Sequence, residues 1–250
     1  MLDAAASDRV IVALDCSHEE SLSLADSLVG HARWIKVGMT LYYACGPSVV
    51  TEMHERGFKV FLDLKLHDIP HQVEGAARAA SLAGADLLSV HSLGGAEMIA
   101  AARKGVDNAA AERAERTRLV GITVLTSMDA EALSQVGIER SLGEEVAQLA
   151  GMAYESGTDG VVCSPREAAA MRLVLGDDAL VVTPGVRPAG ASVGDQRRVA
   201  TPLDAMRAGA SHIVVGRPIT EAPDVAMAFD SIAGEVAEAL EGFGTSPDAS

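Results

Sequence analysis

The chain has 250 residues, of which 48% are hydrophobic and 22% charged, a globular composition with ample material for a buried core. Its length fits one large α/β domain or two small ones. The 35 acidic residues outnumber the 20 basic ones and give a formal net charge of −15, which argues against nonspecific binding to nucleic acid or anionic membranes but leaves room for a small anionic substrate.

Short β-rich segments alternate with amphipathic helical segments along the whole chain. The predicted strands are residues 10–15, 34–38, 59–65, 87–91, 119–125, 160–164, 180–184 and 212–216. The predicted helices are residues 17–29, 47–56, 73–83, 96–108, 142–156, 165–175, 202–208 and 224–240. Eight such units without a linker predict a single (β/α)8 TIM barrel domain over residues 1–250. An open doubly wound sheet is the alternative, although it usually has fewer strands and no GxGxxG motif follows the first predicted strand.

Two segments interrupt the alternation, and both termini are expected to be frayed. Residues 127–141 form an insertion with room for a short extra helix. Residues 186–201 are polar and rich in Gly, Pro and Arg, as is typical of a lid or a ligand-binding loop. We expect residues 1–8 and 242–250 to be frayed.

The N-terminal segment and the cysteines predict a cytoplasmic protein in a reducing compartment. No basic n-region or long apolar h-region of a signal peptide is present, and no apolar stretch approaches the roughly 20 residues of a membrane span. Cys16, Cys45 and Cys163 are scattered and odd in number, and they form no CxxC pair or metal-spaced pattern with His. We expect them to be small buried thiols.

The third predicted strand ends in a cluster of charged residues. Asp63 and Lys65 share one face of the strand, because side chains two residues apart point to the same side. Asp68 has the other parity and lies past the strand end, where the chain turns at Pro70. Burying opposite charges costs desolvation energy, so this cluster indicates either a chemical use or a surface location.

Polar residues also mark the ends of most other predicted strands. Active sites of TIM barrels lie at the C-terminal ends of the strands, and this convergence favours an active site over a solvated surface. His91, beside Ser92, is interpreted as a hydrogen-bonded structural residue, and His67 as an orienting or packing residue. The candidate residues at strand ends are Asp15, Lys36, Asp63, Lys65, Thr126, Arg187, Gly216 and Arg217.

The loops after the seventh and eighth predicted strands are typical of a phosphate site, which TIM barrels commonly build there. Residues 183–188 and 214–220 each place an Arg beside a Gly. The Gly lets backbone N–H groups approach an anion, and the Arg offers a planar fork for phosphate oxygens. Gln196 is placed to close over the ligand from the 186–201 segment.

These motifs together resemble those of orotidine 5′-phosphate decarboxylases, over nearly the whole chain from Asp15 to Thr220. The charged run alone is shared with sugar-phosphate relatives, whereas its combination with the lid and both arginine motifs is highly specific. In one departure, the usual Asn-Thr after Ile-Pro is replaced by His71-Gln72. The resemblance is carried by residues 63–70, 184–188, 195–196 and 215–220.

The resemblance implies cofactor-free decarboxylation of orotidine 5′-phosphate to UMP and CO2, in de novo pyrimidine biosynthesis. Lys65 would donate the proton to C6, with Asp63 against the substrate carboxylate. Lys36 and Asp68 would complete an alternating charge network, and Asp68 would reach into the neighbouring site of a homodimer. The resemblance further implies that Asp15 and Lys36 contact ribose, Thr126 the pyrimidine, and Arg187, Gln196, Gly216 and Arg217 the phosphate.

Two other functions stay open at this point. The first is a Mg²⁺-dependent decarboxylase or aldolase of a sugar phosphate on the same scaffold, which needs further acidic ligands besides Asp63 and Asp68. The second is a catalytically silent phosphate-binding protein, against which the intact Lys65 argues. No motif for pyridoxal phosphate, thiamine or a metal is visible as an electron sink, so the sequence predicts no cofactor.

Overall fold

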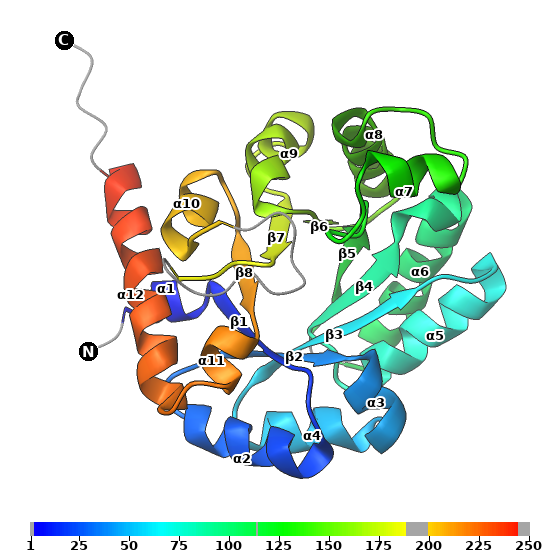
Figure 1. Ribbon diagram of the computed structural model, residues 1–250. Coiled ribbons are helices and arrows are strands. Elements are labelled where there is room, and N and C mark those ends of the chain that lie inside the picture. The colour runs from blue at the N-terminus through cyan, green and yellow to red at the C-terminus, as the bar shows by residue number, and fades with distance from the viewer. Residues whose placement is uncertain (1–2, 114, 189–199, 245–250) are drawn as a thin grey trace.

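The computed structural model describes residues 3–113, 115–188 and 200–244, in which eight parallel strands close into a barrel (Figure 1). The strands pair in chain order, and β8 pairs with β1 to complete the circle. This closure confirms the predicted TIM barrel and rules out the open sheet. The strands are β1 (Val10–Leu14), β2 (Trp34–Gly38), β3 (Lys59–Leu66), β4 (Leu87–His91), β5 (Arg118–Ile122), β6 (Gly160–Val162), β7 (Leu180–Pro184) and β8 (His212–Val215).

The helices surround the barrel and bury the outward faces of the strands. Ser141 caps the N-terminus of the helix Leu142–Glu155 with a capping box, in which the side chains of Ser141 and Glu144 each bind the other residue's backbone N–H. The helices are α1 (Ala4–Ser7), α2 (His18–Leu28), α3 (Met39–Cys45), α4 (Ser48–Glu55), α5 (Pro70–Leu82), α6 (Gly95–Ala110), α7 (Ala130–Gln135), α8 (Leu142–Glu155), α9 (Ala168–Leu175), α10 (Pro202–Arg207), α11 (Arg217–Thr220) and α12 (Val225–Gly244). Among the described helices, none is long and apolar enough to cross a bilayer.

Side-chain alternation along the strands divides the apolar core into two layers. In β1, Val12 packs outward into the main core against the helices, whereas Ile11 packs inward with Trp34 and Phe61. The inward layer fills the barrel with side chains, as expected for a closed eight-stranded barrel. The barrel interior is therefore solid below its C-terminal rim.

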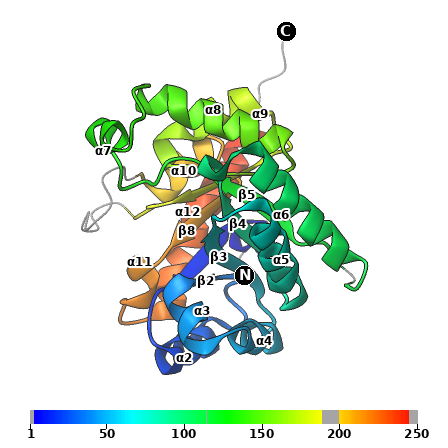
Figure 2. The same cartoon turned by 90° about the vertical axis from the view of Figure 1, so that its right-hand side faces the viewer.

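Helices α5 and α6 lie side by side along their length (Figures 1 and 2). Gly105 of α6 makes this close approach possible, because a Cβ at that position would overlap the Glu74 carbonyl of α5. The two helices follow β3 and β4, so this packing supports the part of the barrel that carries the charged run.

Several expectations about boundaries need correction. Residues 1–8 are not frayed throughout, because α1 (Ala4–Ser7) is capped by the Asp3 side chain and buries Ala6. Helix α12 likewise continues through Gly244, past the expected start of a frayed tail at residue 242. Strands β5 and β6 end earlier than predicted, at Ile122 and Val162.

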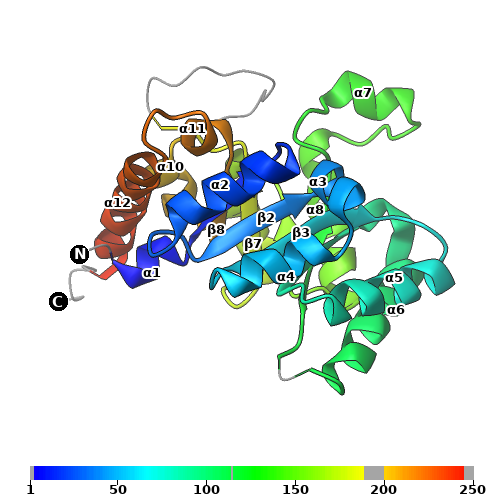
Figure 3. The same cartoon turned by 90° about the horizontal axis from the view of Figure 1, so that it is seen from below.

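The insertion at residues 127–141 contains the short extra helix that the sequence has room for, namely α7. Helices α7 and α11 both follow the C-terminal ends of strands and lie on the same side of the barrel (Figure 3). In the expected lid segment, Val186 forms an isolated bridge with Ala200, and residues 189–199 lie outside the described residues.

Candidate active site

A cavity of about 630 Å³ opens where the strands end at their C-terminal side. Its lining comes from β1, β2, β3, β5, β6, β7 and β8 and the segments that follow them. Nearly all the candidate residues meet here, although they are far apart in the sequence. Those that line the cavity are Asp15, Lys36, Asp63, Lys65, Thr126, Arg187, Gly216 and Arg217.

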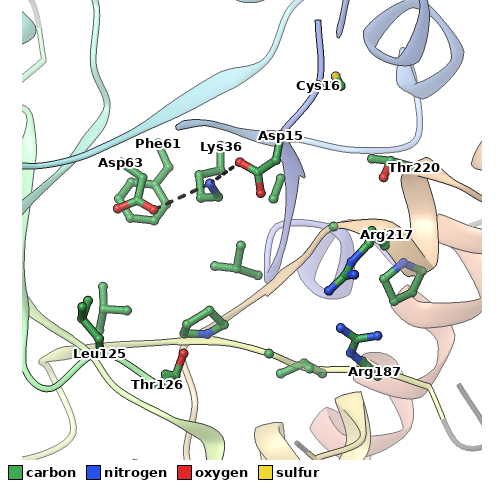
Figure 4. A pocket seen from close by; sticks show the side chains of 18 of the residues that line it. Asp15, Cys16, Lys36, Phe61, Asp63, Leu125, Thr126, Arg187, Arg217 and Thr220 are labelled. Atoms are coloured by element: carbon green, nitrogen blue, oxygen red, sulfur yellow. Dashed lines mark hydrogen bonds and ion pairs between the residues drawn. The ribbon is translucent and has the colours of Figure 1, made fainter. Parts of the chain in front are cut away.

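Four of these residues form a line of alternating charges, which we call the charge array: Asp15, Lys36, Asp63 and Lys65. Figure 4 shows the first three of them, with Lys36 between the two carboxylates. Lys36 Nζ lies 3.1 Å from Asp15 Oδ1 and 3.6 Å from Asp63 Oδ2. Lys65 Nζ lies 2.7 Å from Asp63 Oδ2. Asp63 is thus shared by two ammonium groups.

The environment of Asp63 keeps its carboxylate ionised. Burial by itself raises the pKa of Asp63, but Lys36, Lys65 and hydrogen bonds from Lys65 and Ser89 outweigh burial and hold the pKa below its usual value. Only 12% of the Asp63 side chain is exposed. The site therefore presents a fixed negative charge beside the Lys65 ammonium.

Lys65 has an unusual backbone conformation for a strand residue. Its φ of 50° makes it the one non-glycine residue of the described chain in the left-handed region. The β3–β4 register shifts between Leu62 and Leu66, so the ladder is irregular where Lys65 lies. Asp63 and Lys65 make contact, as expected from their shared parity. The strand, however, is irregular from Leu62 to its end at Leu66.

The opposite side of the cavity carries two guanidinium groups. Arg187 follows β7 and is buried, with 7% exposure, whereas Arg217 begins α11 and is exposed. Both lie across the cavity from Asp63 and Lys36 (Figure 4). Gly216, the residue before Arg217, lines the same end of the cavity. One end of the cavity therefore carries the alternating charges of the charge array, and the other end carries the two arginines.

One described candidate residue, Asp68, is not brought into this cavity. Asp68 is exposed beyond the end of β3, where its Oδ1 accepts a hydrogen bond from the Ile69 N–H at 2.7 Å. It is absent from the cavity lining of this single chain. Gln196 lies outside the described residues.

Gly38, Ser89 and Cys16 belong to the site although the sequence did not single them out for it. A Cβ on Gly38 would lie 3.0 Å from Asp15 Oδ1 and 3.1 Å from Lys36 Nζ, so only glycine leaves this pair undisturbed. Ser89 binds Asp63 from the neighbouring strand. The parity of β4 could have indicated Ser89, because it shares a face with His91 two residues later.

Cys16 corrects the expectation of three buried thiols. Cys163 is buried as expected, but Cys16 and Cys45 are only partly buried, and Cys16 lines the cavity. Burial, then the charges of Glu20 and Asp15, raise the pKa of the Cys16 thiol to about 11. Cys16 therefore stays protonated and is a poor nucleophile at neutral pH.

His67 and His91 stack beside the charge array, with ring centroids 5.1 Å apart. Burial, His67 and Lys65 lower the pKa of His91 to about 4, so its ring is neutral at pH 7. Its Nδ1 accepts a hydrogen bond from the Leu93 N–H at 3.4 Å. These contacts agree with the interpretation of His91 as a hydrogen-bonded structural residue.

The described residues contain no group of three or more His, Cys, Asp and Glu side chains placed to hold a metal ion. The two carboxylates of the cavity that face each other across Lys36 are Asp15 and Asp63, and both are paired with ammonium groups. The carboxylates of the charge array therefore form ion pairs with lysines.

Comparison with known proteins agrees with this geometry. Residues 8–232 match the model of the orotidine 5′-phosphate decarboxylase / HUMPS family. The chain is 49% identical over 239 residues to the orotidine 5′-phosphate decarboxylase of Moorella thermoacetica, covering 94% of this chain and 95% of that protein. It is 51% identical over 232 residues to the enzyme of that name from Halorhodospira halophila, covering 92% and 97%.

Solved structures show the same likeness. The crystal structure of orotidine 5′-phosphate decarboxylase from Lactobacillus acidophilus superposes with a TM-score of 0.81 at 39% identity, covering 92% of this chain and 99% of that one. An uncharacterized conserved protein from Geobacillus kaustophilus matches with the same TM-score of 0.81 and 39% identity, covering 91% and 99%. The similarity extends over nearly the full length of each chain.

Proposed function

Because the chain belongs to the orotidine 5′-phosphate decarboxylase / HUMPS family, its reaction is the decarboxylation of orotidine 5′-phosphate to UMP in pyrimidine biosynthesis, and we propose that Lys65 donates the proton to C6. The observation that supports this role is the contact between Lys65 and the buried, ionised Asp63, at the floor of a cavity whose other end carries two arginines. The Lys65 side chain is thereby positioned at one end of a nucleotide-sized space.

The chemistry calls for a positive charge at this point. When the C6–carboxylate bond breaks, CO2 leaves and the electron pair remains on C6, in the plane of the ring, where the π system stabilises it poorly. The Lys65 ammonium stabilises this charge as it develops and then transfers a proton to C6. The neutral amine regains its proton from water after the product leaves. No cofactor is needed to balance the step.

Asp63 acts on the bound substrate and on Lys65. Placed against the substrate carboxylate, it raises the energy of the ground state, and this repulsion is relieved as CO2 departs. Its 2.7 Å contact with Lys65 Nζ orients the ammonium toward the reacting carbon. Lys36, 3.6 Å from Asp63, keeps this carboxylate charged in a buried setting.

The remaining cavity residues bind the parts of the nucleotide that do not react. Asp15 and Lys36, 3.1 Å apart, present an acceptor and a donor to the ribose hydroxyls. Thr126 lies by the pyrimidine, on the β5 side of the cavity. Arg187 and Arg217 hold the phosphate with the Gly216 backbone and Gln196. Binding energy from this remote group is realised at the transition state.

We further propose a homodimer in which Asp68 completes the neighbouring site. Asp68 is exposed and lies outside its own cavity. Large apolar side chains are exposed in the segments that follow β2, β3 and β4, as is typical of a protein interface. They are Met39 at 44%, Tyr43 at 73%, Ile69 at 63% and Leu93 at 42% exposure. Gln72, exposed on the first turn of α5, could reach the partner's ribose in place of the usual Thr.

A mixed dimer tests the shared site. Asp68→Ala and Lys65→Ala chains should each be nearly inactive as homodimers. When they are refolded together, one site of each mixed dimer contains both native residues, so activity should return to about a quarter of the wild-type value, since half the dimers are mixed and each has one intact site. Failure to recover activity on mixing would refute the sharing of Asp68.

The activity itself is tested by following the fall in ultraviolet absorbance as purified protein converts orotidine 5′-phosphate to UMP. We expect conversion by the wild type, undiminished after treatment with EDTA. Loss of activity with EDTA that Mg²⁺ restores would favour metal-dependent sugar-phosphate chemistry on the same scaffold. UMP binding without conversion would indicate a silent phosphate-binding protein. The cytoplasmic location stays a prediction from the sequence.

A further inference from the structure

Ser89 of β4 connects the two charged residues of β3 through one hydroxyl group. Its Oγ donates a hydrogen bond to Asp63 Oδ1 at 2.8 Å and accepts one from the Lys65 backbone N–H at 2.9 Å. Ser89 is completely buried. The directions of both bonds are fixed, because an ionised carboxylate can only accept and a backbone N–H can only donate.

The hydroxyl stands where the regular strand pairing fails. The register between β3 and β4 shifts between Leu62 and Leu66, and Lys65 has a φ of 50°. A lysine in this left-handed region persists only when its surroundings hold it there. The Ser89 hydroxyl supplies the partner that a strand would otherwise give to the Lys65 N–H, so the bend depends on a contact from the next strand.

The same hydroxyl also sets how the Asp63 carboxylate is turned. Oδ1 is occupied by Ser89, and Oδ2 is left to face both Lys65 Nζ and Lys36 Nζ. Rotation of the carboxylate away from the lysines would break the Ser89 bond. One side chain therefore fixes both the orientation of the Asp63 carboxylate and the backbone at Lys65.

We propose that Ser89 is a positioning residue for the decarboxylation, which holds Asp63 and Lys65 in their reacting geometry without touching the substrate. This role rests on the function proposed above. It assigns to β4 a direct part in the site, although β4 contributes no residue to the cavity wall.

The expected effect of Ser89→Ala is a fall in kcat of about 10- to 100-fold, because a buried carboxylate oxygen and a buried N–H both lose their partner. The affinity for UMP, held mainly by the arginines at the far end of the cavity, should change by less than about threefold. Ser89→Thr keeps the hydroxyl and should restore most of kcat.

A matched control is available three residues along the chain. Ser92 is also completely buried, and its hydroxyl makes no hydrogen bond within the part of the chain that the structure describes. Ser92→Ala removes the same group from the same region and should leave kcat and the affinity for UMP unchanged. A loss common to both variants would indicate a general packing effect and would contradict the positioning role.

The pH dependence of kcat/KM gives a second test, because loss of packing alone would leave this dependence unchanged. The Ser89 hydrogen bond helps to lower the pKa of Asp63, so its removal should shift the acidic limb of the kcat/KM profile to higher pH. Wild-type kcat in Ser89→Ala, or a parallel loss of UMP affinity, would overturn the proposal. An inactive wild type would instead remove the proposed function, and with it the role of Ser89.

Discussion

Lys36 and Asp63 expose only 11% and 12% of their side chains, yet both carry charge. Desolvating such ions costs several kcal/mol each, and the cost is offset only when each has close partners of opposite sign. The charge array provides these partners in alternation from Asp15 to Lys65. Removing one member leaves a neighbour buried without its partner, so every residue of the array affects the rest.

At the other end of the cavity, Arg217→Ala tests the phosphate site. In the proposed phosphate site the exposed Arg217 would contribute charge-assisted hydrogen bonds to the phosphate, so the variant should bind UMP about 10- to 100-fold more weakly. Isothermal titration calorimetry with UMP measures this directly. Arg207→Ala serves as the control, because Arg207 lies in α10 outside the cavity and its nearest acidic partner is Glu238 at 3.7 Å. Equal UMP affinity in the two variants would contradict a phosphate contact by Arg217.

The sequence predicted the contact between Asp63 and Lys65, because strand parity is a local property. It could not predict the left-handed backbone of Lys65, since in that conformation the Lys65 N–H donates a hydrogen bond to Ser89, 24 residues away. Gly38 was missed for a similar reason. Its lack of a side chain leaves room for Asp15 and Lys36, which come together only in the folded barrel.

At the scale of whole elements, the helices that cover the barrel differ in how closely they approach one another. The crossing of α5 and α6 is so close at Gly105 that only a residue without a side chain fits against the Glu74 carbonyl. Gly234 of α12 is exposed, and nothing lies within 4 Å of where its Cβ would be. The same residue type is therefore required in one helix and unnecessary in another.

This contrast gives opposite expectations for the same substitution. Gly105→Ala should lower the free energy of unfolding by about 1–3 kcal/mol, because the α5 backbone must move. Gly234→Ala should raise it by roughly 0.5–1 kcal/mol, because alanine restricts the unfolded chain and favours the helix. Urea denaturation midpoints measure both changes. Changes of the same sign in the two variants would contradict this description of the packing.

The eight strands were predicted nearly where they lie, since each is a short apolar run followed by a helical pattern. The short helices α3 and α11 were missed at the ends of β2 and β8, because helices of seven and four residues carry little periodicity. Strand β5 was extended too far, through residues 123–125, because Thr123 and Val124 are buried like strand residues although the ladder has ended.

For the whole molecule, the closed end of the barrel differs electrostatically from the open one. There His212 packs edge-on against Trp34, with ring centroids 5.8 Å apart, and only 5% of His212 is exposed. Burial, then Arg118, Arg9 and Lys59, lower the pKa of His212 from 6.5 to about 3. His212 is therefore neutral in the folded protein across the physiological range.

The lowered pKa of His212 predicts acid sensitivity of the fold. Between its unfolded pKa of 6.5 and its folded pKa of about 3, the unfolded state binds more protons, so stability falls as pH falls. The slope approaches roughly 1.4 kcal/mol per pH unit once the pH is well below 6.5. His212→Phe keeps a ring against Trp34 but cannot titrate. Denaturation midpoints from pH 7 to pH 5 should fall more steeply for the wild type; parallel curves would contradict the assignment.

The placement of charged groups around the cavity depends on the whole barrel and not on single strands. Asp68 was expected past the end of the third strand, and in the single chain it lies outside its own cavity. The parity difference between Asp63 and Asp68 did indicate that the two would diverge. The overall charge of −15 did not prevent a cationic end of the cavity, because Arg187 and Arg217 are brought together only when β7 and β8 become neighbours.

The most direct measurement compares the conversion of orotidine 5′-phosphate to UMP by the wild type and by Lys65→Ala, after calorimetry has shown that both bind UMP. We expect rapid conversion by the wild type. The variant should be slower by at least about 100-fold, because the other lysine in the lining of the described cavity, Lys36, is paired with Asp15. Comparable conversion by a Lys65→Ala protein that binds UMP normally would contradict the assignment of Lys65 as the proton donor.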